Sequence, residues 1–253
     1  MPKPGRFYLC QRDAPDPRDH ERAAPVSAER PPVFDLRHVC PPVYNQGDLG
    51  SCTANAIAAA VEIDLRSAQR PQWMPSRLYI YYNERARLNA VATDTGGRLR
   101  DGVKSLAKLG VCPEALWRYD VAQFAVKPDE ACYADGRMNL AAKYGRVAQT
   151  AEALEQVLFS GKPVLFGFSV YSGFESKRMA KTGCLKLPGP REKLIGGHAV
   201  LCVGYDQTNK RFLVRNSWGI HWGLSGYFWM PYDYFCNPNL AHDFWVIDTF
   251  GGG

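Results

Sequence analysis

The 253-residue sequence lacks the features that indicate a metal centre, a membrane span or a nucleic-acid partner. No two of its eight cysteines are close enough for a CxxC motif, so neither a zinc site nor a redox dithiol is predicted. No run of about 18 apolar residues occurs, which argues against a membrane span. Basic and acidic residues number 31 and 25 and are largely interleaved, so the net charge of +6 gives nucleic-acid binding little support.

The N-terminus MPKPGRFYLC lacks the apolar segment of a secretory signal. We therefore expect a protein that stays in the cytoplasm or is exported by another route. Internal repeats are also missing. What is present is an ordinary globular composition, with 46% hydrophobic residues and enough length to bury a core in one large domain or two smaller ones that share a cleft.

The chain divides into an extended arm, a helical part and a β-rich part. Residues 1–32 contain seven of the 18 prolines and no sustained periodicity, which predicts an extended arm. Helices are predicted by apolar spacing, and strands by apolar runs between glycine and asparagine turns. The predicted helices are 54–68, 76–88, 102–109 and 151–159, and the predicted strands are 163–170, 198–205, 211–215 and 226–230. This segregation favours an α+β fold with a mainly helical subdomain (33–145), a mainly β subdomain (146–253) and a site between them.

One cysteine stands in an unusual context, NQGDLGSCTANA at residues 45–56. Cys52 precedes the first predicted helix, and the unpaired amides at a helix N-terminus stabilise a thiolate. Taken alone, this cysteine could be a packed core thiol, a metal ligand, half of a disulfide or a nucleophile. The choice depends on partners elsewhere in the chain.

Suitable partners follow in the second half of the sequence. His198, in IGGHAVLCVGY, lies at a predicted strand after two glycines and is a candidate general base. Asn216, in RNSWG, could hold the imidazole in one orientation, with Trp218 shielding that hydrogen bond from water. Gln46 lies six residues before Cys52, so its amide and the Cys52 backbone N–H could bind a tetrahedral oxyanion.

These residues resemble those of the papain-like cysteine peptidases. The shared segments are NQGDLGSC (45–52), GGHAV (196–200), RNSWG (215–219) and HWGLSGY (221–227). The separations also agree, since 198 − 52 is 146 and 216 − 52 is 164, against roughly 130 to 150 for the family's histidine and somewhat more for its asparagine. FDLR at 34–37 resembles the mature start of the family, and the resemblance extends over about residues 32–246.

The resemblance implies a two-subdomain papain-like fold with an antiparallel β-barrel-like second subdomain. It implies a thiol endopeptidase that acts on peptides or proteins through a covalent acyl-enzyme, without metal or organic cofactor. Cys52 would be the nucleophile, His198 the base and acid, Asn216 the orienting residue and Gln46 the oxyanion donor. The residues that it implies for substrate binding are Gly96, Gly97, Gly197 and Trp218. Two alternatives stay open: an acyltransferase or amidase with the same nucleophile, and a catalytically silent binding module. Nothing in the sequence indicates the oligomeric state.

Departures from the family pattern are informative. Thr53 stands where an aromatic residue is usual, and Leu49 stands where many members have a disulfide cysteine. With the ending NPNLAHDFWVID, this variation is most similar to bacterial members of the xylellain type. The arm is shorter than the inhibitory segments usual in the family. We consider two states for it, a propeptide-like strand across the cleft, suited to a groove that binds extended peptides, and a disordered arm.

The remaining cysteines and histidines are expected to be structural. Cys202, in an apolar strand, is predicted to be a core thiol. His221 and His242 are expected to be surface or capping groups. A disulfide between Cys112 and Cys132 is conceivable, but free thiols are the default expectation because sequence cannot set connectivity.

Overall fold

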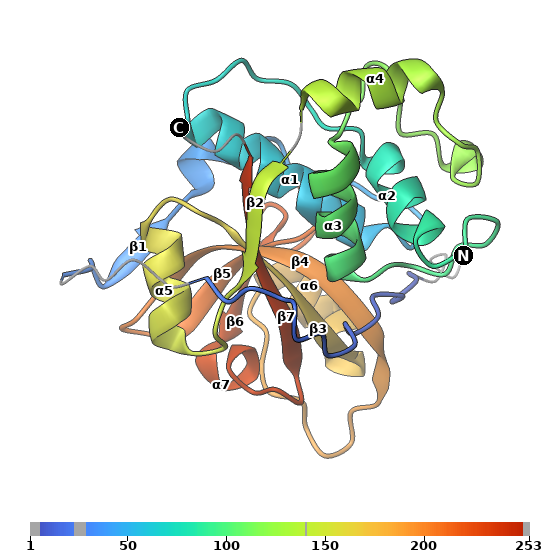
Figure 1. The fold of residues 1–253 in the computed structure, drawn as a ribbon. Coiled ribbons are helices and arrows are strands. Elements are labelled where there is room, and N and C mark those ends of the chain that lie inside the picture. Colours follow the sequence, from blue (N-terminus) through green and yellow to red (C-terminus); the bar gives the residue numbers. More distant parts are fainter. Residues whose placement is uncertain (1–5, 23–28, 140, 250–253) are drawn as a thin grey trace.

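The computed structural model describes residues 6–22, 29–139 and 141–249. In the view of Figure 1 a group of helices lies above and a β-sheet lies below. The helices are α1 (Cys52–Ser67), α2 (Arg77–Ala86), α3 (Leu99–Leu109), α4 (Glu130–Met138), α5 (Ala151–Phe159), α6 (Lys177–Thr182) and α7 (Tyr232–Phe235). The strands are β1 (Val33–Asp35), β2 (Ala141–Arg146), β3 (Val164–Tyr171), β4 (Leu194–Asp206), β5 (Arg211–Arg215), β6 (Tyr227–Pro231) and β7 (Ala241–Thr249).

The strands form one antiparallel sheet in the order β2-β7-β3-β4-β5-β6, and β1 pairs with β4 outside this path. The predicted α+β, papain-like architecture is confirmed. The sheet is open, however, because β2 and β6 lie at opposite ends of the strand order, so the expected barrel-like subdomain is not closed. Strands β1 and β2 pair with β4 and β7, which lie in the second half of the chain, so the sheet contains strands from both predicted subdomains. The predicted boundary between the subdomains, at residues 145 and 146, stays a prediction.

Helix α1 is buried along most of its length. Its residues from Cys52 to Leu65 are all buried, and the helix packs between β4 and α2. Alanines on several faces explain this environment, because small side chains let the helix approach the sheet while Ile57 and Val61 fill the core. The helix begins at Cys52, two residues before the predicted start, so the cysteine occupies its first turn.

The core of the sheet follows the predicted apolar runs. Strand β3 and residues 198–206 of β4 are almost wholly buried, with Phe166 and Phe168 fully inside. Three strands, β1, β2 and β7, and three helices, α4, α6 and α7, were not predicted. Strand β7 interrupts its apolar residues with His242, Asp243 and Asp248, which hides the strand pattern in the sequence.

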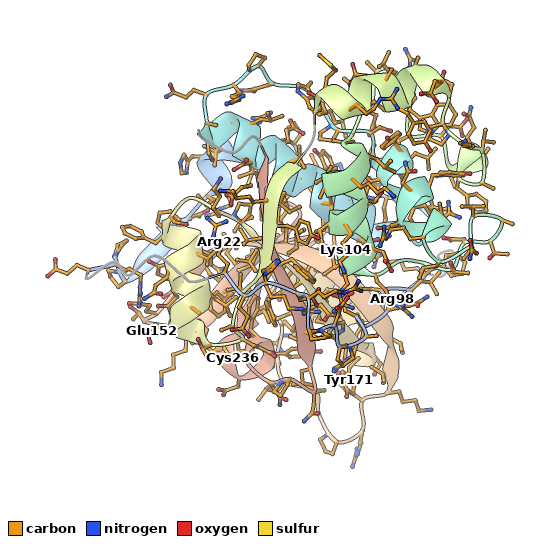
Figure 2. All side chains as sticks on the ribbon, viewed as in Figure 1. Arg22, Arg98, Lys104, Glu152, Tyr171 and Cys236 are labelled. Atoms are coloured by element: carbon orange, nitrogen blue, oxygen red, sulfur yellow. The ribbon has the colours of Figure 1, made fainter. Side chains whose placement is uncertain are left out.

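The described part of the arm, residues 6–22, crosses the molecule between the helical half and the sheet (Figure 1). Leu9 pairs in parallel with Gly197 of β4, and Glu21 pairs in parallel with Arg146 of β2. In Figure 2, Lys104 and Arg22 lie along this path. The described part of the arm is held by main-chain hydrogen bonds to the body of the protein, and the extended arm over residues 1–32 stays a prediction. Within the described ranges, no helix combines the length and the apolar character that a membrane crossing requires.

Candidate active site

Cys52 begins α1 and is completely buried. Its Sγ accepts a hydrogen bond from the backbone N–H of Ala199 at 3.4 Å, which places it beside His198 on β4. The pKa of the Cys52 thiol is well below its ordinary value. The largest cause is a hydrogen bond from the Cys10 thiol of the arm, followed by the imidazole of His198, and together with the Ala199 N–H these outweigh the opposing effect of burial. This shift favours the thiolate form of Cys52.

His198 is oriented by Asn216. The His198 Nε2 lies 2.9 Å from the Asn216 Oδ1, and both side chains are buried. This bond leaves Nδ1 as the ring nitrogen for the Cys52 thiolate. Asn216 is itself fixed, because its Oδ1 also accepts the backbone N–H of Ser217 at 2.8 Å. The thiol, imidazole and amide thus lie together at the start of α1, on β4 and after β5, and the His198 Nδ1 has no hydrogen-bond partner among the described residues.

Aromatic rings cover this series. The Trp218 indole is stacked on the His198 imidazole, with ring centroids 5.0 Å apart and planes inclined by 26°. The buried rings of Trp222 and Phe174 pack against Trp218. The turn that brings Trp218 here contains Gly219 at a φ of 74°, a left-handed conformation that favours glycine. The stacked indole covers the His198 ring that contacts Asn216. That Trp218 shields this hydrogen bond from water stays a prediction.

Gln46 also reaches the site. Its Nε2 donates to the Leu49 carbonyl at 2.9 Å, and its Oε1 accepts the Ser217 hydroxyl at 2.5 Å. The side chain is buried and held in one orientation. An amide nitrogen carries two hydrogens, so one remains to meet an oxyanion next to Cys52. All four predicted catalytic residues therefore meet at one place.

The glycines that were predicted to bind a substrate strand bind the arm instead. Gln11 N donates to Gly97 O at 3.0 Å, Cys10 N donates to Gly197 O at 3.0 Å, and Gly197 N donates to Tyr8 O at 3.2 Å. A Cβ on Gly197 would lie 2.2 Å from the Cys10 carbonyl oxygen, and one on Gly96 would lie 2.0 Å from the Leu9 carbonyl oxygen. The approach of the arm thus needs glycine at these positions.

Arm side chains complete the cover of the site. The guanidinium of Arg6 lies 3.9 Å from the ring centroid of Trp218, and Tyr8 meets His198 edge-on at 5.9 Å. Cys10 is buried, and its thiol lies next to the Cys52 sulfur. Of the arm, residues 6–11 therefore touch the thiol, the imidazole and the indole of the candidate site.

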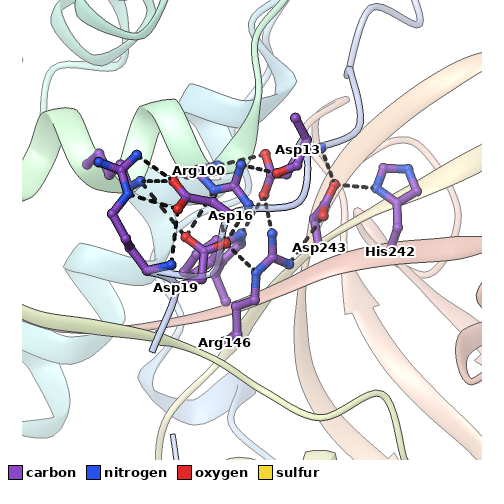
Figure 3. Close-up of polar contacts among 11 residues, drawn as sticks. Asp13, Asp16, Asp19, Arg100, Arg146, His242 and Asp243 are labelled. Atoms are coloured by element: carbon purple, nitrogen blue, oxygen red, sulfur yellow. Dashed lines mark hydrogen bonds and ion pairs between the residues drawn. The ribbon is translucent and has the colours of Figure 1, made fainter. Parts of the chain in front are cut away.

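Farther along, the arm is tied to the body by a group of charged residues, which we name the arm cluster (Figure 3). Its members are Asp13 and Asp19 of the arm, Arg100 of α3, Arg146 of β2 and Asp243 of β7. Arg146 contacts Asp19 at 2.8 Å, Asp13 at 3.2 Å and Asp243 at 3.3 Å. Arg100 forms an ion pair with Asp19 and donates its backbone N–H to Asp13. One arginine thus joins the arm to two strands of the sheet.

The carboxylates of the arm cluster are deeply buried. The Asp13 side chain is 0% exposed, and burial, with the neighbouring Asp243, raises its pKa to about 6. Burial opposes the charge of Asp19 too, but hydrogen bonds from Arg100 and Arg146 prevail and lower its pKa. Buried ion pairs of this kind stabilise the fold only when every partner is present, because a buried charge without a partner destabilises the folded state.

His242 corrects one expectation. It is not a surface group, because it is 91% covered and its Nδ1 lies 2.7 Å from Asp243. The ring fits because it packs on Gly167, where an added Cβ would lie 2.5 Å from the imidazole. His221 is exposed, as expected. Cys202 is a buried core thiol, and all eight cysteines are free.

Within the described ranges, no group of three or more histidine, cysteine, aspartate or glutamate side chains is placed to bind a metal ion. Sequence reasoning missed Cys10 and the arm cluster as neighbours of the site. No local pattern marks them, because their partners lie far along the chain. Asp13 and Asp243 are separated by 230 residues.

Residues 30–243 match the family described as papain family cysteine protease. The chain is 44% identical, over 96% of both chains, to the crystal structure of xylellain, a cysteine protease from Xylella fastidiosa, and superposes with a TM-score of 0.91. It is also 44% identical over 229 residues to a peptidase C1-like protein, L477, of Acanthamoeba polyphaga mimivirus, which covers 85% of this chain and 74% of the relative. The structure of digestive procathepsin L2 from Tenebrio molitor shares the fold at 22% identity and a TM-score of 0.74, over 96% of this chain and 78% of that one.

The chain belongs to the papain family of cysteine proteases. It is a hydrolase of the thiol protease class, and its substrates are peptides or proteins. The predicted similarity to the xylellain type is confirmed, while one of its close curated relatives is viral rather than bacterial.

Proposed function

We propose that the protein is an endopeptidase in which Cys52, His198, Asn216 and Gln46 are the catalytic residues. The observation that carries the proposal is the 2.9 Å contact between the His198 Nε2 and the Asn216 Oδ1, next to the Cys52 sulfur that accepts the Ala199 N–H. A buried thiolate beside an oriented imidazole is the arrangement that nucleophilic catalysis requires. No cofactor enters the mechanism.

The reaction follows from the position of each group. The Cys52 Sγ attacks the carbonyl carbon of the substrate, and the Gln46 amide with the Cys52 backbone N–H stabilises the oxyanion. As the C–N bond breaks, His198 gives its proton to the leaving amine and a thioester remains on Cys52. His198 then takes a proton from water, whose oxygen attacks the thioester and releases the carboxylic acid and the thiolate. Asn216 keeps the imidazole aligned through both transfers.

The substrate strand would use the main-chain groups that now bind the arm. Gly97 and Gly197 offer carbonyl and amide groups on opposite walls of the site, and Gly96 leaves room for a close backbone. These groups cannot bind Tyr8, Cys10 and Gln11 and a substrate at the same time. We therefore infer that the arm, residues 1–32, acts as a propeptide-like inhibitor and that the chain is a zymogen.

A comparison of the full chain with one that begins at Pro32 tests this function. The shorter chain is expected to hydrolyse fluorogenic peptides and to form a covalent adduct at Cys52 with an epoxysuccinyl inhibitor, identified by mass spectrometry. The full chain is expected to do both more slowly, because the arm covers Cys52. Circular dichroism and thermal unfolding serve as controls for the fold of the shorter chain.

The outcomes separate the alternatives. Equal rates in the two chains would reject inhibition by the arm and leave the peptidase. An adduct with acyl transfer to added amines, and little hydrolysis, would indicate a transferase. Neither adduct nor hydrolysis in a folded shorter chain would reject the enzyme and favour a binding module.

The pH dependence of the thiol gives a second test. Iodoacetamide reacts with the thiolate, and a free thiol has a pKa of about 8.5. Because the pKa of Cys52 is lowered, its alkylation in the shorter chain is expected to reach its plateau below that pH. Removal of the arm removes the Cys10 contribution and leaves those of His198 and Ala199 N–H. A rate constant for Cys52 that still rises at pH 9 would contradict the assignment. The exposed Cys184 is an internal comparison in the same digest.

A further inference from the structure

Two thiols from distant parts of the chain face each other in the closed site. The backbone of Cys10 is held against Gly197 in two ways. Its N–H donates to the Gly197 carbonyl oxygen at 3.0 Å, and the preceding residue, Leu9, pairs in parallel with Gly197. Cys52 is fixed by α1 and by the Ala199 N–H. Their side chains lie next to each other, and neither is more than 8% exposed. Such a pair is positioned for a reaction that joins the two sulfurs.

The two sulfurs differ in protonation. The contact with Cys52, then burial, raises the pKa of the Cys10 thiol and favours its protonated form. The same contact lowers the pKa of Cys52 and favours its thiolate form. A thiolate next to a second thiol is the arrangement of a cysteine that is oxidised first and a resolving cysteine that follows.

We propose that Cys10 and Cys52 form a disulfide when the closed protein meets a peroxide, which converts the bound arm into a covalent and reversible block of the site. Proteolytic loss of the arm could not be reversed, whereas a reducing thiol would break this bond and restore the free pair. The proposal rests on the proposed role of Cys52 as a reactive thiolate.

The steps balance with hydrogen peroxide as the oxidant. The Cys52 thiolate attacks one peroxide oxygen, the O–O bond breaks, hydroxide leaves and Cys52 becomes a sulfenic acid. The Cys10 sulfur then attacks the Cys52 sulfur. The S–O bond breaks, the Cys10 proton goes to the departing oxygen, and water leaves. Two sulfurs are oxidised by one electron each, and peroxide is reduced to hydroxide and water. A dithiol reductant reverses the bond by thiol–disulfide exchange.

Peptide mapping of the full chain tests the proposal. The protein is treated with hydrogen peroxide, the remaining thiols are alkylated, and a digest without reductant is analysed by mass spectrometry. We expect a linked pair of peptides that contains Cys10 and Cys52, lighter by two hydrogen atoms than the free peptides. The link is expected to disappear with dithiothreitol. The exchange Cys184→Ser removes an exposed thiol and is a matched control that should keep the link.

The exchange Cys10→Ser removes the resolving thiol but keeps a hydrogen-bond donor. In this variant Cys52 is expected to pass to sulfinic and sulfonic acids that dithiothreitol does not reduce, whereas the unaltered chain recovers its Cys52 thiol completely. Cys112 and Cys132, whose thiols are also neighbours, provide a comparison within the same digest. A link confined to Cys112 and Cys132, or equal irreversible oxidation of Cys52 with and without Cys10, would overturn the proposal. Thermal unfolding shows whether the variant is folded.

The proposed function and this proposal can fail separately. A link between Cys10 and Cys52 in a protein whose shorter chain has no peptidase activity would leave the disulfide and reject the enzyme mechanism. Peptidase activity at Cys52 in a protein that forms no such link would reject the disulfide alone.

Discussion

Replacing Cys52 with alanine in the chain that begins at Pro32 is expected to lower kcat/KM for peptide hydrolysis by at least about 10⁴-fold. The reason is chemical, since no other nucleophile is held between the His198 imidazole and the Gln46 amide in the described residues. The remaining groups could still bind a peptide and stabilise an oxyanion, so the substrate affinity should change far less than kcat. A fluorogenic peptide assay under reducing conditions measures both quantities.

The matched control for this exchange is Cys184→Ala, which removes an exposed thiol from outside the site. It should leave kcat/KM unchanged. A folded Cys52→Ala variant that retains a tenth or more of the activity would show that another residue is the nucleophile. Thermal unfolding must be compared, because the Cys52 Sγ accepts a backbone hydrogen bond from Ala199.

The parts of the site that the sequence predicts are those with local signals. Cys52 stands at a helix start that the alanine pattern marks, and His198 stands in a glycine-preceded apolar strand. Asn216 follows the end of a strand and precedes Trp218 and a glycine turn. In each case the neighbouring residues fix the backbone of the side chain. The sequence therefore indicates both the residue type and the element that carries it.

Contacts across the chain could not be predicted in the same way. Nothing near Cys10 indicates a partner at position 52, because the contact depends on how the arm pairs with Gly197 and Gly97. Strand β7 was missed because His242 and Asp243 are buried polar residues whose partners, including Asp13, are supplied by distant segments. Satisfied buried charges break the apolar pattern on which sequence interpretation relies.

Loss of the arm cluster is expected to weaken the docking of the arm in the full chain. The exchange Arg146→Met removes three ion pairs at once and leaves the buried carboxylates of Asp13 and Asp19 with fewer partners. Breaking a buried pair costs about 3–5 kcal/mol, and we take about 3 kcal/mol because the arginine side chain is 24% exposed. Two of its three partners lie in the arm, so most of the loss falls on the docked arm. By the usual relation of free energy to equilibrium, docking should weaken by about 10²-fold.

The full-length Arg146→Met variant is therefore expected to hydrolyse peptides at a rate approaching that of the chain that begins at Pro32, and its arm should be cut faster by an added protease. Arg18→Met is the matched control, since Arg18 is 83% exposed and pairs only with Asp16 inside the arm. Exposed pairs contribute about 0–1 kcal/mol, so its activity should stay near that of the unaltered chain. If Arg146→Met instead lowers the melting temperature without raising activity or cleavage of the arm, the cluster stabilises the sheet. In that case the main-chain contacts of residues 8–11 alone would hold the arm over Cys52.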